Sequence, residues 1–394
     1  MAFAHRLPVE VLALIFRVCF PSNLPEPSTD LASAIFTSAP CNISQVCSRW
    51  RTVALSLPAL WAQWFVSIRN ATSRDVWKLV GILRTWRDRS RVEPLSAFIA
   101  VAPGIGFEEQ LKLGGDAKEA IEALFDLVYE LEPRWCRMNL SIDAPSSFIR
   151  GSTRCLEPTK LTHLQELHVS AYPRYEMPSC NIRFFALRAT PPAFCSLRTL
   201  VLTNDKSSKM LSPSLTRQCL VILHHAPQLE TFEVTLVSPI SDENFPNFPV
   251  VPAPSLRRLV LDVCEQPARG FACKFILDHL IAPALEKLII KSKHSDGIAE
   301  EAYETCGFVS DFLSRSRPPL TELTLCMAMT QKKLMAILRQ LPYLTVLHLG
   351  VNLFNALLKE GSKDALCPGL QRLKFPVSAI EYLRPSSRTG LYSG

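Results

Sequence analysis

The sequence lacks the short motifs that mark common enzyme and cofactor sites. It has no GxxxxGK[ST] phosphate loop, no GxSxG nucleophile turn and no HExxH zinc motif. Gly104 and Gly106 have neither the third glycine nor the preceding strand and following helix of a dinucleotide-binding loop. We therefore expect no catalytic residue, no cofactor and no bound metal ion.

Metal-ligand spacing and disulfide patterns are also missing. The 13 cysteines include no CxxC pair, and the closest two are Cys41 and Cys47. His224 and His225 are adjacent and point to different sides of a helix, so they do not form a metal pair. An odd number of cysteines, mostly beside apolar residues, is typical of buried thiols in a reducing compartment. The expected location is the cytoplasm or the nucleus.

No apolar run is long enough to cross a bilayer. The stretch Val11–Phe20 spans ten residues and is interrupted by Arg17. No small-residue cleavage site follows it cleanly, which argues against a signal peptide. We expect no membrane partner.

The charge balance is mildly basic, with a net charge of +7 and a pI near 8.8. With 48% hydrophobic and 20% charged residues, the chain is globular and not disordered. The local basic excess is concentrated in Arg69, Arg74, Lys78, Arg84, Arg87, Arg89 and Arg91. This stretch allows two interpretations, a nucleic-acid patch or a solvated helix face. The near absence of interleaved glycines and aromatic pairs favours the helix face, so nucleic acid is not an expected partner.

Two apolar segments near the start of the chain predict a small helical module. Leu7–Phe16 is predicted to be a short helix with Pro8 in its first turn. Its apolar residues cover well over half of the circumference, more than one core-facing stripe requires. In Val46–Ala54, the residues Val46, Trp50 and Val53 recur at helical spacing. A helix as apolar as the first one needs two partners, one within its own chain and one outside it.

These segments resemble an F-box, particularly the form common in mushroom-type (basidiomycete) fungi. The resemblance is carried by Leu-Pro-x-Glu-Val-Leu-x-x-Ile-Phe from Leu7, Val-Cys-x-x-Trp-Arg-x-x-Ala from Val46, and the closing pair Leu60-Trp61. It covers roughly residues 6 to 64. The alternative is a plain helical hairpin whose leucine and tryptophan residues form a core. A Pro- and Ser-rich insert, Pro21–Asn42, departs from the family pattern.

The resemblance implies a module that docks on the Skp adaptor of a cullin–RING (SCF) ubiquitin ligase. Mapped onto this sequence, it implies adaptor contacts at Leu7, Pro8, Leu12, Ile15, Val46, Cys47 and Trp50. Some of these residues are equally suited to the module's own core.

The rest of the chain contains a degenerate repeat. Residues 72–90 and 116–131 predict helices, and 95–101 predicts a strand. Segments of the form Leu-x-x-Leu-x-Leu then follow, beginning at Leu164, Leu197, Leu229, Leu256, Leu285, Leu320, Leu344 and Leu370, with a weaker one at Trp135. Their last two apolar residues point to one side of a short strand, and we expect a polar residue between them to point to the other. Residues 215–225, 271–281, 303–314 and 332–341 are predicted helices between these strands.

The repeated segments resemble a leucine-rich-repeat domain. The buried Asn or Cys of that family is found only at Cys264 and Asn352, so a regular asparagine ladder is absent. A wound α/β domain with a parallel sheet is the alternative. The expected fold class is α/β, a small helical F-box module followed by a leucine-rich-repeat-like solenoid of parallel strands and helices.

The expected organisation is an F-box at 1–65, a linking helix at 66–94, a leucine-rich-repeat-like domain at 95–383 and a flexible tail at 384–394. By resemblance, the chain would be the substrate-recognition subunit of an SCF ligase, with partners in a Skp-type adaptor, cullin through it, and an unknown target protein. It would contribute binding and no catalytic group. The alternatives are a protein-interaction scaffold that binds the adaptor without directing ubiquitination, and an orphan gene product with little function. A loop at Asp242–Pro249 is either a recognition loop or plain solvated loop.

Overall fold

The computed structural model describes most of the chain in two compact units. The described residues are 7–18, 39–69, 72–102, 115–142, 161–171, 194–204, 213–236, 248–263, 271–292, 307–327, 329–350, 353 and 367–374. Unit 1 comprises residues 1–212 and 225–229, and unit 2 comprises 213–224 and 230–394. The predicted tail at 384–394, most of the loop at 242–249, and the positions of Cys264 and Asn352 lie outside the described residues.

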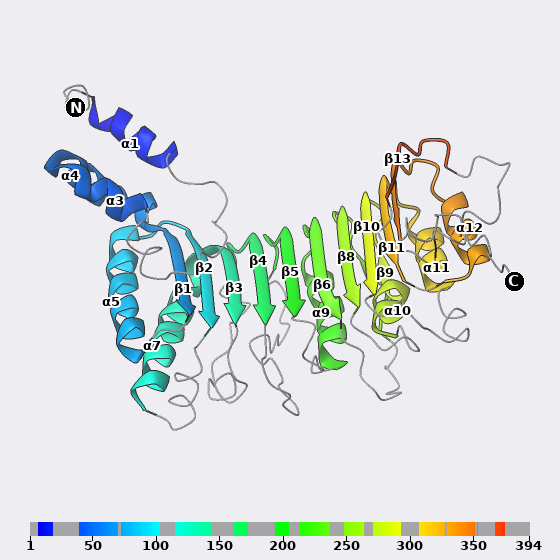
Figure 1. Cartoon of the computed structure of the whole chain (residues 1–394), viewed down its shortest axis with the longest axis horizontal. Helices are drawn as coiled ribbons and strands as arrows, with labels where there is room; N and C mark the ends of the chain where they lie inside the picture. Colours follow the sequence, from blue (N-terminus) through cyan, green and yellow to red (C-terminus); the bar gives the residue numbers. More distant parts are fainter. Residues whose placement is uncertain are drawn as a thin grey trace, which may run out of the picture. The chain divides into compact units, whose positions relative to one another are not determined.

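Unit 1 begins with short helices and continues into a parallel sheet (Figure 1). Its helices are α1 (Val9–Val18), α3 (Ala39–Val46), α4 (Ser48–Ser56), η1 (Pro58–Trp61), α5 (Ser73–Ser90), α7 (Asp116–Glu130) and η2 (Glu132–Arg134). Its strands are β1 (Gln63–Arg69), β2 (Leu95–Ala102), β3 (Trp135–Ile142), β4 (Glu166–Ala171) and β5 (Thr199–Asn204). The strands are parallel and lie in sequence order.

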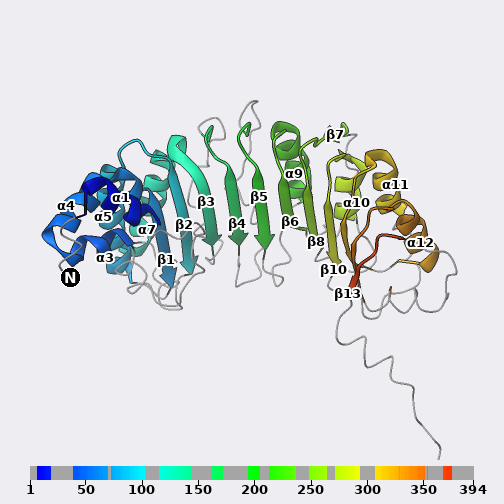
Figure 2. The same cartoon turned by 90° about the horizontal axis from the view of Figure 1, so that it is seen from above.

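Unit 2 repeats a strand-and-helix unit. Its helices are α9 (Pro213–His225, belonging to unit 2 up to His224), α10 (Phe271–Asp278), α11 (Gly307–Ser316) and α12 (Gln331–Arg339). Its main strands are β6 (Thr231–Leu236), β8 (Arg258–Val263), β10 (Lys287–Ser292), β11 (Glu322–Cys326), β12 (Val346–Leu349) and β13 (Arg372–Lys374). A small separate pair is formed by β7 (Val251–Pro252) and β9 (Leu280–Ile281). Figure 2 shows α10, α11 and α12 following one another along one face of the strands.

The prediction of an α/β fold with parallel strands is confirmed. Apart from the short pair β7 and β9, the strands of each unit pair in sequence order, which is the arrangement of stacked repeats. A doubly wound sheet reverses its strand order at a switch point, and neither unit does so among its described strands. This order favours the solenoid-like interpretation over the wound α/β alternative.

One structural device recurs at the start of the repeats. The amide of Leu256 donates to the carbonyl of Ala253, and the amide of Leu285 donates to that of Ala282, both at 3.3 Å. The proline after each alanine, Pro254 in the first case, therefore occupies the second position of a β-turn, where its fixed φ is favourable.

A second device links neighbouring repeats. The Glu230 carbonyl accepts hydrogen bonds from the amides of both Arg257 and Arg258, at 2.8 and 2.9 Å. The carbonyl of Arg257 accepts in the same way from Glu286 and Lys287 of the next repeat, both at 2.9 Å. Because backbone groups make these bonds, the stacking tolerates the irregular sequence of the repeats.

The leucine positions form the core of unit 2. The aligned residues Phe232, Leu259, Leu288, Leu323 and Leu347 are buried. The expectation of a polar residue between the two apolar ones is wrong at several strands, because Val201, Val260 and Ile289 occupy that position. Val260 and Ile289 are buried even though they lie on the strand face opposite the leucines.

Tryptophans hold the start of the sheet in unit 1. The Trp61 indole N–H donates to the Ala54 carbonyl at 2.9 Å, and its ring lies edge-on to that of Trp86, with ring centres 6.1 Å apart. Trp64 packs edge-on against Trp135 with ring centres 5.5 Å apart. These fully or almost fully buried rings tie η1, α5, β1 and β3 into one core.

Two boundaries differ from prediction. The predicted boundary between the F-box at 1–65 and the linking helix at 66–94 falls inside β1, whose residues pair with β2. Val46 and Trp50 do not share one helix, because α3 ends at Val46 and α4 begins at Ser48. The predicted helix over 72–90 is confirmed as α5, whose N-cap Thr72 forms a capping box with Asp75. Hydrogen bonds from Thr72 lower the pKa of the Asp75 carboxyl.

Candidate functional site

Helix α1 carries two apolar faces. Leu12 and Phe16 form the first face and are fully buried. The second face lies on the other side of the helix, where Leu14 is 65% exposed and Val18 is 76% exposed. It is completed by Val11 and Ile15, so its members recur at i, i+3, i+4 and i+7. We call Val11, Leu14, Ile15 and Val18 the outer face of α1.

The inner side of α1 is anchored on α4. The rings of Phe16 and Trp50 lie 5.0 Å apart between centres, and the Arg49 guanidinium donates to the Leu7 carbonyl. Contacts near both ends of α1 therefore set its rotation about its own axis. This rotation turns the outer face away from α4.

The break between α3 and α4 is stabilised by a cysteine cap. The Cys47 sulfur accepts a hydrogen bond from the Trp50 amide at 3.4 Å, in the position usually held by Ser, Thr, Asp or Asn. The Arg51 side chain donates to the Ser44 carbonyl at 2.9 Å and links the two helices. Val46 remains 61% exposed just before this break.

The structure separates the seven residues predicted to contact an adaptor into three groups. Pro8, Ile15 and Val46 are exposed and available to a partner. Leu12 is fully buried and belongs to the module's own core. The remaining three are half-buried residues that hold the helices together, namely Leu7, Cys47 and Trp50.

Sequence reasoning left three members of the outer face out of the predicted contact set. They are Val11, Leu14 and Val18. The wide apolar arc of this helix is visible in the sequence. The spacing of its residues does not determine which half of the arc faces the core. Leu55 of α4, which is 41% exposed, was also missed.

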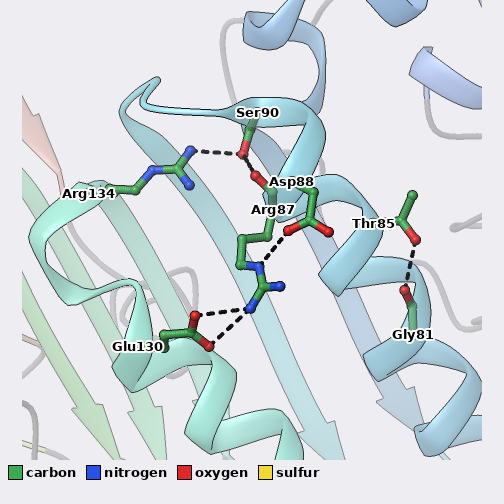
Figure 3. A network of polar contacts seen from close by, with 7 residues as sticks. All are labelled: Gly81, Thr85, Arg87, Asp88, Ser90, Glu130 and Arg134. Atoms are coloured by element: carbon green, nitrogen blue, oxygen red, sulfur yellow. Dashed lines mark hydrogen bonds and ion pairs between the residues drawn. The ribbon is translucent and has the colours of Figure 1, made fainter.

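Part of the basic stretch along α5 is engaged within unit 1 (Figure 3). Arg87 contacts Asp88 at 2.9 Å and Glu130 of α7 at 3.0 Å, and the hydrogen bond to Asp88 raises the pKa of the guanidinium. Arg134 donates to the Ser90 hydroxyl at 2.8 Å. Arg89 lies over the Trp61 ring, 4.4 Å from its centre. These contacts favour the interpretation as a partly interfacial helix face over a nucleic-acid patch.

The strand face of unit 1 opposite its leucines is nearly neutral. One row across the strands contains Phe65, Phe98, Asn139, His168 and Val201. The first two rings stack with their centres 5.0 Å apart. In the next row, Ser170 and Thr203 share a hydrogen bond of 2.7 Å between their hydroxyls.

The corresponding face of unit 2 is charged. It presents the side chains of Glu233, Arg258, Asp262, Lys287, Lys291, Glu322, His348, Arg372 and Lys374, and we call it the charged face. Toward β6 the charges are paired, with Arg258 to Glu233 at 3.6 Å and Lys287 to Glu322 at 2.6 Å. Toward β13 it carries cations: Arg372 and Lys374 are exposed on β13, beside His348 on β12.

Several thiols are buried enough to remain protonated. Burial raises the pKa of Cys219 to about 12, and it also raises the pKa values of Cys136, Cys326 and Cys367. Protonated thiols are weak nucleophiles and weak metal ligands. Within the described part of the chain, no three His, Cys, Asp or Glu side chains gather into a metal site. None of the described helices combines the length and apolar character needed to cross a bilayer.

Comparisons with protein-family models and with curated proteins found no match to this chain. A functional assignment therefore depends on the residues and on their arrangement.

Proposed function

We propose that this chain is the target-recognition subunit of an SCF-type (cullin–RING) ubiquitin ligase. Its N-terminal module binds a Skp-type adaptor, and cullin through that adaptor, while its repeat strands bind a target protein. The chain works in the cytoplasm or the nucleus. It supplies no bond-making group and accelerates ubiquitin transfer by holding a target lysine near the conjugating enzyme.

The observation that carries the proposal is the outer face of α1. An exposed apolar stripe on a helix whose opposite side is already packed is typical of helix-in-groove recognition. The order of the F-box-like residues from Leu7 to Trp61 places this stripe in the segment that would meet the adaptor. Exposed Val46 adds apolar surface close to the start of α4.

The first test is binding of a recombinant Skp-type adaptor to the full chain. Replacing Leu14 and Val18 with aspartate should weaken binding by about 30-fold or more, since two apolar contacts of about 1–2 kcal/mol each are lost. Both residues are exposed, so circular dichroism should show an unchanged fold. Val92→Asp is the matched control, because Val92 is 90% exposed and lies outside the module.

Failure of the folded wild-type chain to bind the adaptor would contradict the proposal, as would equal effects of the module variant and Val92→Asp. A reconstituted reaction with adaptor, cullin and RING subunits then separates a ligase subunit from the scaffold alternative. Target ubiquitination that requires the outer face of α1 supports the ligase role. Adaptor binding without any ubiquitinated product supports the scaffold.

A further inference from the structure

The cations at the β13 end of the charged face are not neutralised by their neighbours. Arg372 and Lys374 make no ion pair with another described residue, whereas Arg258 and Lys287, nearer to β6, are paired. The acidic side chain nearest to them by strand register is Glu322, which is held by Lys287 at 2.6 Å. We call His348, Arg372 and Lys374 the basic cluster.

The strand register places this cluster on one face. His348 lies directly opposite Lys374 on the neighbouring strand, so their Cα atoms are about 5 Å apart. Arg372 and Lys374 are two residues apart on β13 and project to the same side. Lys291 acts on the same histidine, since both Lys291 and Lys374 lower the pKa of His348, after the larger effect of burial.

We infer that the basic cluster binds an acidic segment of the target protein, with carboxylate or phosphate groups at alternate positions of an extended chain. This inference rests on the proposed target-binding role of the repeats. Alternate side chains of an extended peptide are about 6.6 Å apart, the same spacing that separates Arg372 from Lys374 along β13. Each acidic group can therefore meet one cation.

Charge on the adjoining strands favours a short acidic peptide over nucleic acid. Glu233, Asp262 and Glu322 lie on the same charged face, and they would repel a polyanion that continued across the strands. The rows of this face hold no Phe, Tyr or Trp side chain on which bases could stack. The acidic portion of the ligand thus ends near β11.

The inference is tested by fluorescence anisotropy with the full-length chain. The probes are a short fluorescein-labelled peptide in which glutamate alternates with serine, the same peptide with phosphoserine at the serines, and a matched glutamine peptide. The glutamate and phosphoserine peptides should bind, and the glutamine peptide should not. The dissociation constants of the two acidic peptides distinguish the two anionic groups, because the group that the cluster prefers gives the tighter-binding peptide.

The variant Arg372→Gln/Lys374→Gln should weaken binding of the acidic peptides by about 10-fold or more. Lys332→Gln/Arg339→Gln removes the same charge from exposed positions of α12 and should change binding by less than about twofold. Circular dichroism checks that both variants are folded.

Three results would overturn the inference. They are no binding of either acidic peptide, equal losses in the two double variants, and binding of a single-stranded oligonucleotide that is as tight and as sensitive to the cluster substitutions. None of these readouts involves the adaptor. Loss of peptide binding with adaptor binding intact removes this inference alone, and the reverse result removes only the adaptor assignment.

Discussion

Helix α1 of unit 1 and helix α12 of unit 2 distribute their apolar residues in different ways. Helix α12 buries one apolar stripe, formed by Leu334, Met335, Ile337 and Leu338. Its exposed positions include Lys332 and Arg339. Helix α1 buries only Leu12 and Phe16 and carries a second apolar face in solvent. The rest of the chain can bury a single apolar stripe of a helix. A second apolar stripe stays in solvent unless a further partner covers it.

This difference separates two uses of hydrophobic residues. In unit 2 each strand-and-helix unit covers the next, so that the leucine positions from β6 to β12 are buried. In the N-terminal module the short helices bury only part of their apolar surface. The comparison yields three further predictions.

The largest effect is expected from truncation of the buried face on each helix. Phe16→Ala should lower the free energy of unfolding by about 3–5 kcal/mol and Ile337→Ala by about 2–5 kcal/mol, because each leaves a cavity. The measurement is urea unfolding followed by circular dichroism. Ile337→Val is the control, with an expected loss of about 0.5–1.5 kcal/mol. Wild-type stability of Phe16→Ala would mean that α1 is not packed on α4.

A smaller effect on stability, but a clear effect on surface chemistry, is expected at the outer face of α1. Replacing Leu14 and Val18 with glutamate should leave the free energy of unfolding within about 0.5 kcal/mol of wild type. Binding of the dye ANS to the native chain should fall, because an exposed apolar patch is removed. Lys332→Glu on α12 should leave dye binding unchanged. Equal dye binding in all three proteins would show that this face is covered in solution.

The smallest effect concerns pH. Burial, Lys374 and Lys291 lower the pKa of His348 below its ordinary value of 6.5, while Glu322 opposes them. His348 therefore binds a proton less readily in the folded state than in the unfolded state. Its contribution to the free energy of unfolding is complete above about pH 6.5. It is lost as the pH falls through the lower pKa of the folded state. His348→Gln should remove this part of the pH dependence of unfolding.

The same site gives a sharper measurement by NMR. Lys374→Gln should raise the pKa of His348, since one of the cations that lower it is removed. Lys332→Gln should leave that pKa unchanged. A titration of His348 that is identical in wild type and Lys374→Gln would place Lys374 too far away to act on it.

Much of the fold was predictable from the spacing of apolar residues. Helix α5 was predicted over 72–90, and its buried face contains the apolar residues that recur there at helical spacing, namely Val76, Leu79, Val80, Leu83 and Trp86. Every Leu-x-x-Leu-x-Leu segment forms a strand, and so does the weaker one at Trp135. These predictions succeed because a period of 3.6 or 2 fixes which side chains share a face.

The errors have one physical origin. Residues 64–68 form a short apolar run, and periodicity alone cannot distinguish a helix from a strand in a run of this length. Pairing with β2 makes it a strand. Val46, Trp50 and Val53 fit helical spacing, but the cap at Cys47 interrupts the helix between the first two. In both cases a contact from elsewhere in the unit overrides the local pattern.

The sequence by itself determined the repeat, the parallel strands it forms and the excess of apolar residues on the first helix, because these depend on spacing along the chain. Only the tertiary structure decided that Leu12 is buried while Leu14 is exposed, since the contact between Phe16 and Trp50 and the bond from Arg49 to Leu7 set the rotation of α1. The tertiary structure also determined which charged side chains of unit 2 lie close together. His348 and Lys374 are far apart in sequence and become neighbours only through the register of parallel strands.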